Sequence, residues 1–122
     1  MQNGSGRDTW EVQLRRGALE LAILSALAAG RLYGIEIIKV LKERSALEVA
    51  EGTIYPILNR LRTDGFVEAE WVESESGHPR KYYWLTREGR ARAKTMADVW
   101  NRFVRNLAAL VDPLIAGTEQ KK

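Results

Sequence analysis

Apolar residues occupy nearly every position of one segment near the start of the chain. The run from Gly17 to Gly30 is apolar except for Glu20. It is too short to span a membrane, and the residues after it include frequent charges. It therefore predicts a buried helix over residues 9–29. Asp8 and Glu11 have the spacing of a capping box at its start, and Gly30 is a typical residue for its end.

A second helix is predicted from Gly34, because apolar residues recur there at intervals of three and four. These residues are Ile37, Ile38 and Leu41. Lys39, Lys42 and Glu43 lie on the opposite side of that helix and are expected in water. The segment from Ser45 to Val49 has no helical pattern and predicts the turn that leads to a third helix.

The third helix has one apolar side and one strongly polar side when its residues are placed about 100° apart. The apolar side consists of Ile54, Ile57, Leu58 and Leu61. The outward side consists of Pro56, Asn59 and Thr63, flanked by Tyr55, Arg60 and Arg62. Amide, hydroxyl and guanidinium groups bond to base edges and phosphates, so this face suits a DNA major groove. An ordinary amphipathic surface helix has the same pattern.

Two starts are compatible with the third helix. A start near Glu51 would place Pro56 where its missing N–H leaves the carbonyl of Gly52 unbonded. A start with Thr53 as the N-cap places Pro56 in the first turn, where the missing donor costs little. We therefore expect Thr53 to cap the helix.

Alternating apolar and polar residues follow, which indicates half-buried strands. Val67, Ala69 and Trp71 alternate with Glu68 and Glu70, and a second strand is predicted from Lys81 to Leu85. The polar residues 74–79 between them predict a hairpin turn. Two helices joined by a turn and followed by a hairpin form a winged helix-turn-helix, so the expected fold is mostly α with a small β-hairpin (α+β).

A heptad pattern fills the last helix, which Thr86 is expected to cap. The repeating positions are Ala93, Met96, Trp100, Phe103, Leu107, Leu110 and Leu114. A helix of roughly 25 residues is about 38 Å long, more than one small domain can cover. We therefore expect a homodimer whose interface contains these positions up to Leu110. Asp112-Pro113 is expected to end or kink the helix.

These patterns divide the chain into four parts. We expect a flexible N-terminus at 1–8, a winged helix-turn-helix domain at 9–86, a long C-terminal dimerisation helix at 87–116 and a disordered tail at 117–122.

Composition excludes several classes of function. The 122 residues include no cysteine and one histidine, so no metal site and no cofactor are expected. A Ser-His-Asp set and a Gly-rich phosphate loop are both missing, so no enzyme is expected. The absence of cysteine and of a membrane span favours the cytoplasm. The net charge is +3, but residues 51–90 hold six Lys or Arg and seven Asp or Glu. DNA binding therefore requires the acidic side chains to lie on another face.

Two stretches carry a family resemblance: GTIYPILNRLRTDGFVEAEW at residues 52–71 and GHPRKYYWLTREGR at residues 77–90. With Tyr33-Gly34 at the start of the second helix, they resemble the PadR family of bacterial transcriptional regulators over roughly Leu14 to Trp100. The resemblance implies a dimeric winged-helix repressor that binds near its own promoter and is released by a small molecule. The family often has Ser where this chain has Ala50.

The partner implied is double-stranded DNA with an inverted-repeat operator, because a two-fold dimer sets two such helices about 34 Å apart. Asn59 suits adenine, and Arg60 suits guanine or a phosphate. Thr53, Tyr55 and Tyr33 can bond backbone oxygens. The predicted DNA-binding residues are Tyr33, Thr53, Tyr55, Pro56, Asn59, Arg60, Thr63, His78, Arg80 and Lys81, with Arg80 and Lys81 at the base of the wing.

Trp100 lies at the centre of the heptad pattern, where it would face its counterpart across a two-fold axis. Two facing indoles suit a planar aromatic effector, although Trp100 can equally well fill the interface alone. The ligand-binding residues expected are Trp100, Met96, Phe103, Asp98 and Trp10, with Asp98 favouring a cation. The alternative function is a winged-helix module that docks a protein through its heptad helix without binding DNA.

Overall fold

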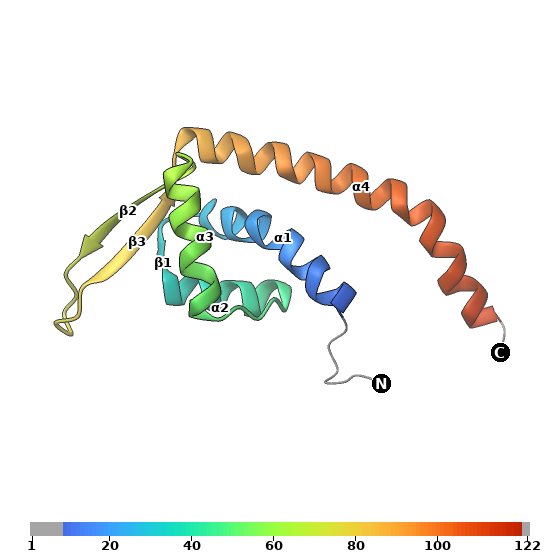
Figure 1. Ribbon diagram of the computed structural model, residues 1–122, viewed down its shortest axis with the longest axis horizontal. Coiled ribbons are helices and arrows are strands. Elements are labelled where there is room, and N and C mark those ends of the chain that lie inside the picture. The colour runs from blue at the N-terminus through green and yellow to red at the C-terminus, as the bar shows by residue number, and fades with distance from the viewer. Residues whose placement is uncertain (1–8, 121–122) are drawn as a thin grey trace.

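The computed structural model describes residues 9–120, and it confirms a mostly helical fold with a small antiparallel sheet (Figure 1). The elements are α1 Thr9–Leu27, β1 Leu32–Tyr33, α2 Gly34–Ser45, α3 Glu51–Thr63, β2 Val67–Val72, β3 Arg80–Leu85 and α4 Arg87–Gln120. The predicted flexible segment 1–8, with the Asp8 cap, and residues 121–122 lie outside the described residues.

The core lies where α1, α2 and α3 meet the inner face of the sheet. Its fully buried side chains are Ile23, Leu24, Leu27, Ile37, Ile54, Leu58, Leu61, Val67 and Tyr83. α3 buries three of the four apolar positions predicted for it, and Ile57 is half-buried. Because this stripe is anchored in the core, the opposite side of α3 is left exposed to solvent.

The predicted Thr53 cap is wrong. α3 begins at Glu51, with Ala50 as the N-cap and without a capping side chain. The amides of Thr53 and Ile54 both donate to the Ala50 carbonyl at 3.0 Å, so Thr53 already lies inside the first turn. Pro56 consequently falls in the second turn, where its ring nitrogen cannot bond the Gly52 carbonyl.

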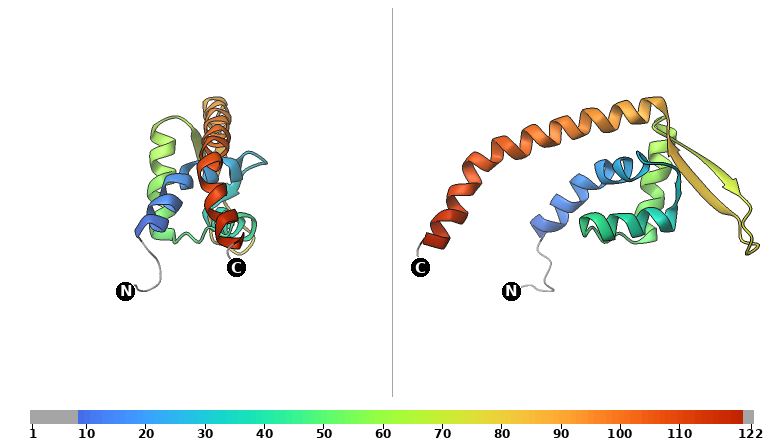
Figure 2. Two further views of the ribbon diagram at one scale, coloured as in Figure 1. Left: turned by 90° about the vertical axis from the view of Figure 1, so that its right-hand side faces the viewer. Right: turned by 180° about the vertical axis from the view of Figure 1, so that it is seen from behind.

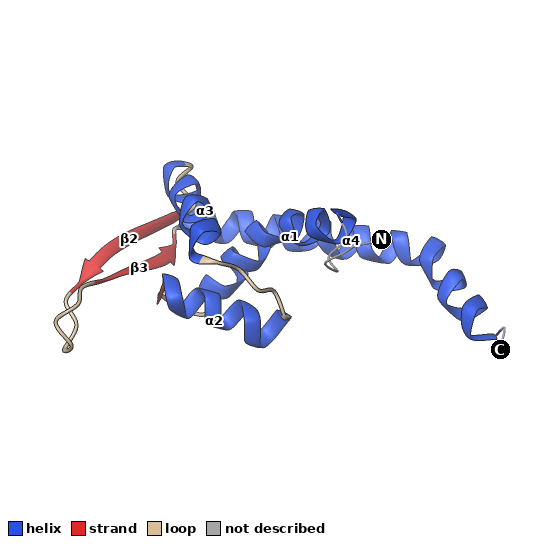
Figure 3. Cartoon of the chain, turned by 60° about the horizontal axis from the view of Figure 1, so that its bottom comes forward, coloured by secondary structure: helices blue, strands red, loops and turns tan. Residues whose placement is uncertain are grey.

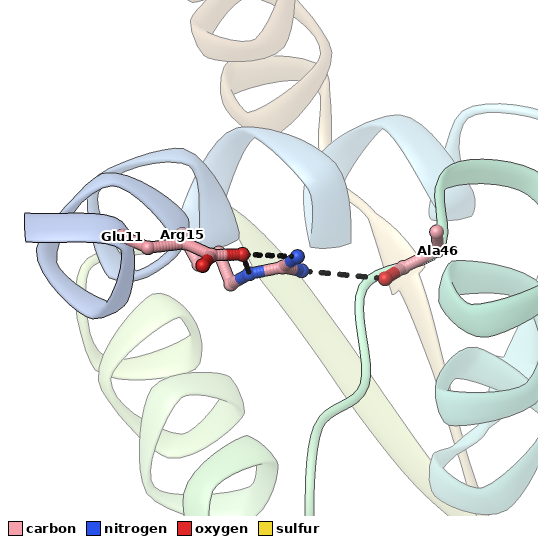
Figure 4. Close-up of polar contacts among 3 residues, drawn as sticks. All are labelled: Glu11, Arg15 and Ala46. Carbon is pink, nitrogen blue, oxygen red and sulfur yellow. Dashed lines mark hydrogen bonds and ion pairs between the residues drawn. The ribbon is translucent and has the colours of Figure 1, made fainter. Parts of the chain in front are cut away.

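An arginine on α1 fixes the turn between α2 and α3 (Figure 4). Arg15 donates to the Glu11 carboxylate, 2.8 Å from Nη2, and to the Ala46 carbonyl, 3.3 Å from Nη1. Ala46 ends α2 in the left-handed region with φ 58°. A side chain of α1 thus bonds the backbone where the chain turns toward α3.

The wing consists of β2 and β3, and β1 adds a third strand in the order β1-β3-β2. β1 was not predicted, because its two residues show no periodic pattern and become a strand only by pairing Leu32 with Tyr83 and Tyr33 with Tyr82. In β2 and β3 the predicted alternation is confirmed. The pairs Val67–Leu85 and Ala69–Tyr83 face the core.

Thr86 caps α4 as predicted. Its hydroxyl accepts from the Gly89 amide at 2.9 Å and donates to the Gly65 carbonyl at 2.6 Å, which ties the start of α4 to the end of α3. The first half of α4 runs beside α1, and the second half continues past it and bends (Figure 2). Pro113 does not end the helix, and residues 117–120, expected to be disordered, are helical. No helix among residues 9–120 is long and apolar enough to cross a membrane.

Candidate nucleic-acid interface

A hollow of about 530 Å³ lies between the wing, the start of α2 and the exposed side of α3. We call it the wing concavity, and Figure 3 shows the three elements that surround it. Its lining residues are Tyr33, Gly34, Ile35, Tyr55, Asn59, Trp71, Pro79, Arg80, Lys81 and Tyr83. Five of the predicted DNA-binding residues therefore meet in one place: Tyr33, Tyr55, Asn59, Arg80 and Lys81.

A glycine brings α2 and α3 together at this hollow. A Cβ on Gly34 would overlap the phenol of Tyr55, so only glycine lets the ring lie against the first turn of α2. Burial raises the pKa of Tyr55, and the nearby Glu51 carboxylate raises it further. The phenol is therefore uncharged at neutral pH and can donate a hydrogen bond to an anion.

Two cations lie on the wing side of the concavity. The Arg80 guanidinium is 4.6 Å from the centre of the Tyr33 ring, and the Lys81 ammonium is 5.7 Å from that of Trp71. Both residues lie beside the hairpin turn, since Val72 pairs with Arg80, and not at the base of the wing as predicted. Aromatic faces hold a cation without neutralising it, so both charges stay available to a ligand.

The acidic residues of β2 lie on the face of the strand opposite its core-facing residues, so for these two residues the charge condition set by the sequence is met. Glu68 and Glu70 alternate with the core-facing residues and pair across the ladder with Trp84 and Tyr82. Arg31 bonds Glu70 at 3.2 Å on that outer face. No carboxylate is among the residues that line the wing concavity.

Arg60 does not join this group. Its Nη2 donates to Glu20 Oε1 of α1 at 2.9 Å, on the other side of α3, so the predicted guanine contact would require this ion pair to break. Thr53 lies on the same side as Arg60, where both line a second hollow between α1 and α3. The geometry thus separates these two residues from the rest of the predicted set.

The remaining predicted DNA-binding residues are exposed. Pro56 and Thr63 lie with Asn59 along the outward side of α3, and His78 lies in the hairpin turn, where its carbonyl accepts from the Ser74 hydroxyl at 2.6 Å. Trp71 was missed because it fits the alternating pattern of a buried strand position, and Ile35 because it lies outside the apolar stripe of α2 and carries no polar group. Whether an apolar residue near the end of a strand or helix is exposed depends on where the folded core ends, and the sequence pattern does not show that.

A third hollow, the α1–α4 groove, has a volume of about 490 Å³. It is lined by Gln13, Leu14, Gly17, Ala18, Leu21, Arg92, Thr95, Met96, Val99, Trp100 and Phe103. Three predicted ligand-binding residues are present, but Asp98 and Trp10 do not line the groove. Of the predicted interface, Ala93 and Met96 pack against the protein's own core, whereas Trp100, Phe103, Leu107 and Leu110 are exposed.

A helix-turn-helix with a wing, and a hollow that gathers cations, phenols and an amide beside the exposed face of α3, define a winged-helix DNA-binding protein. Residues 23–95 match the transcriptional regulator PadR-like family. The chain belongs to this family, whose members regulate transcription and are not enzymes.

Several relatives agree with this assignment. A transcriptional regulator of Mycobacterium tuberculosis is 34% identical over 79 residues, which cover 65% of this chain and 72% of that protein. A PadR-like transcription factor from Bacteroides fragilis is 39% identical, with a TM-score of 0.69, over 84% of this chain and 99% of that one. A PadR family regulator from Eggerthella lenta is 30% identical, with a TM-score of 0.76, over 84% and 89%.

Proposed function

We propose that this DNA-binding regulator acts as a homodimeric repressor on an inverted-repeat operator and leaves the DNA when a planar ligand binds. The observation that carries the proposal is the wing concavity, where two cations and three tyrosines converge beside Asn59 with no carboxylate in the lining. The protein-docking alternative is not favoured, because a docking helix would expose aliphatic or aromatic side chains where α3 exposes polar ones.

In the proposed complex the outward side of α3 enters the major groove. Asn59 donates to and accepts from one adenine, and Thr63 and Pro56 contact neighbouring bases. The hydroxyls of Tyr33 and Tyr55 donate hydrogen bonds to phosphates, and the same phosphates attract Arg80 and Lys81. His78, in the hairpin turn, reaches toward the adjacent minor groove.

The dimer is proposed from the exposed apolar residues of α4. Leu110 is 74% exposed and Phe103 56% exposed, and both belong to a stripe that continues where α1 no longer covers α4. A second copy, related by a two-fold axis, supplies an equal stripe. Burying both stripes removes this apolar surface from water.

The effector is proposed to bind where Trp100 of one copy approaches Trp100 of the other, at the end of the α1–α4 groove. Met96 and Phe103 supply apolar contacts beside the indoles, and a flat aromatic molecule fits such a space. Asp98 and Trp10 lie outside the groove lining, so the proposed contacts to the effector come from Trp100, Met96 and Phe103.

DNA binding is tested by fluorescence anisotropy of the DNA upstream of the protein's own gene, beside an unrelated duplex and at several salt concentrations. We expect the protein to prefer the upstream DNA. In Lys81→Ala, the plot of log affinity against log salt should become shallower by about 0.9, because one phosphate contact is lost. Equal binding to both duplexes at every salt concentration would contradict a sequence-specific regulator.

Effector binding is tested with proflavine, a flat aromatic cation, and the free protein. We expect proflavine to quench tryptophan fluorescence in the wild type and in Trp84→Phe, a control on the wing. Quenching should disappear in Trp100→Ala while the dimer persists. Unchanged quenching in Trp100→Ala would refute the site.

A further inference from the structure

Trp71 is a large apolar side chain on the wing, and unlike Trp84, which is half-buried, it is 65% exposed. It belongs to the inner face of β2, whose residues become steadily more exposed along the strand. Val67 is buried, Ala69 is half-buried, and Trp71 extends beyond the core. No core packing explains an indole at this position, so its role depends on what occupies the space in front of it.

That space is the wing concavity. Trp71 pairs with Lys81 across the strand ladder, and the Lys81 ammonium lies 5.7 Å from its ring. Ile35, which is 46% exposed, contributes a second apolar side chain from the first turn of α2. The lining therefore combines two exposed apolar side chains with the cations of Arg80 and Lys81.

A DNA strand has a matching surface, because anionic phosphates alternate with apolar deoxyribose rings along its backbone. An acidic peptide also carries negative charge, but the concavity is continuous with Asn59 on the outward side of α3. Whatever fills the concavity must therefore adjoin the molecule that α3 contacts. Duplex DNA in contact with α3 meets that condition with its own backbone.

We infer that Trp71 and Ile35 pack against deoxyribose rings of one DNA strand while Arg80 and Lys81 contact the phosphates of the same strand. This inference rests on the proposed DNA-binding function and adds an apolar backbone contact to it. Trp71 removes apolar surface from water when DNA binds, and it contributes affinity without contributing charge.

The two kinds of contact differ in their dependence on salt. Removing a phosphate contact makes the plot of log affinity against log salt shallower by about 0.9, whereas removing an apolar contact shifts the line without changing its slope. We expect Trp71→Ala to weaken binding of the upstream duplex about tenfold at every salt concentration. Trp71→Phe, which keeps an aromatic ring, should recover part of that loss.

Trp10 provides the matched control, because it is 66% exposed but lies at the start of α1, away from the concavity. Trp10→Ala should bind the duplex as the wild type does. In the full chain labelled with 5-fluorotryptophan, the fluorine signal of Trp71 should shift on addition of duplex and lose its response to replacing H₂O with D₂O. The Trp10 signal should do neither.

The outcomes separate this inference from the proposed function. If no duplex binds, both fail. If the duplex binds but Trp71→Ala has wild-type affinity and the Trp71 signal stays in place, DNA binding stands and the inference is overturned. If the salt dependence of binding is as shallow in Trp71→Ala as in Lys81→Ala, Trp71 acts only by holding Lys81, and the inference is again overturned. A Trp71 signal that shifts with polyglutamate and not with duplex would identify an acidic peptide as the occupant.

Discussion

Glycine at position 34 allows the phenol of Tyr55 to reach the wing concavity, so we expect Gly34→Ala to act on DNA binding through that ring. The added methyl group must displace Tyr55, which we expect to lower DNA affinity about tenfold and the free energy of unfolding by about 1 kcal/mol.

Gly17→Ala is the matched control, because Gly17 also lies in a helix and a Cβ there meets no atom within 4 Å. It should raise stability by about 0.5 kcal/mol, since alanine favours helix, and leave DNA affinity unchanged. Urea unfolding and fluorescence anisotropy measure the two effects. Wild-type DNA affinity in Gly34→Ala would contradict a role for the Tyr55 position.

Tyr83 makes stability depend on alkaline pH. It is 2% exposed, and its pKa is raised mainly by burial and further by Tyr55, against a smaller lowering by Arg62. The folded state therefore keeps the proton more tightly than the unfolded state, whose tyrosine has a pKa of about 10. This contribution to stability is complete below about pH 10 and is lost as the pH rises through the higher folded value.

Tyr83→Phe should consequently reduce the loss of unfolding free energy between about pH 8 and pH 11. Urea unfolding at both pH values measures it. Tyr55 has a raised pKa for a similar reason, so part of the dependence should remain in the variant. An identical pH dependence in wild type and variant would show that Tyr83 does not contribute.

Among the elements, α3 is tied to both α1 and α4 through one carboxylate. Glu20 bonds Arg60 of α3 at 2.9 Å and lies 3.9 Å from Arg92 of α4. These arginines are about half exposed, so the ion pairs contribute little to stability, on the order of 1 kcal/mol or less. Their effect is to hold the Arg60 guanidinium away from the wing concavity.

In Arg60→Ala the slope of log affinity against log salt should therefore stay near the wild-type value. In Lys81→Ala it should become shallower by about 0.9. Anisotropy titrations of the two variants over the same salt range make the comparison. An equal lowering in both would mean that Arg60 leaves Glu20 and contacts a phosphate in the complex.

Periodicity within one element was enough to predict α2, the buried side of α3 and the two wing strands, and residue type was enough to predict the Thr86 cap. What it could not predict depends on partners distant in sequence. β1 exists only through pairing with β3, and the orientation of Arg60 depends on Glu20, forty residues away. The start of α3 was misplaced because backbone bonds to Ala50 form without the capping side chain that a sequence pattern reveals.

Within the candidate site, residue type indicated the polar members, and the fold brought Tyr33, Tyr55, Asn59, Arg80 and Lys81 together. The apolar members were missed, because strand alternation assigns Trp71 to the same face as the buried Val67. Only the length of the strand relative to the core shows that this face becomes exposed.

For the whole molecule, the exposed stripe of α4 predicts that assembly can be removed without unfolding the body. Leu107→Lys with Leu110→Lys places two charges on the stripe, outside the core, so we expect the mass of a single chain and an unchanged helical circular dichroism spectrum. Asn101→Lys adds charge on the opposite side of the helix and should stay dimeric. Analytical ultracentrifugation distinguishes the two masses, and a dimer that survives the double substitution would place the interface elsewhere.

In the proposed complex, α4 joins two copies so that both α3 helices enter successive major grooves of one duplex. The most direct test measures binding to an inverted repeat whose half-sites are about 10 bp apart, and to the same repeat with about 5 bp inserted, which turns one half-site to the opposite face. We expect two chains per duplex on the first DNA and a loss of at least about tenfold in affinity on the second. Equal affinity for both duplexes, with each half-site occupied independently by a single chain, would contradict this arrangement.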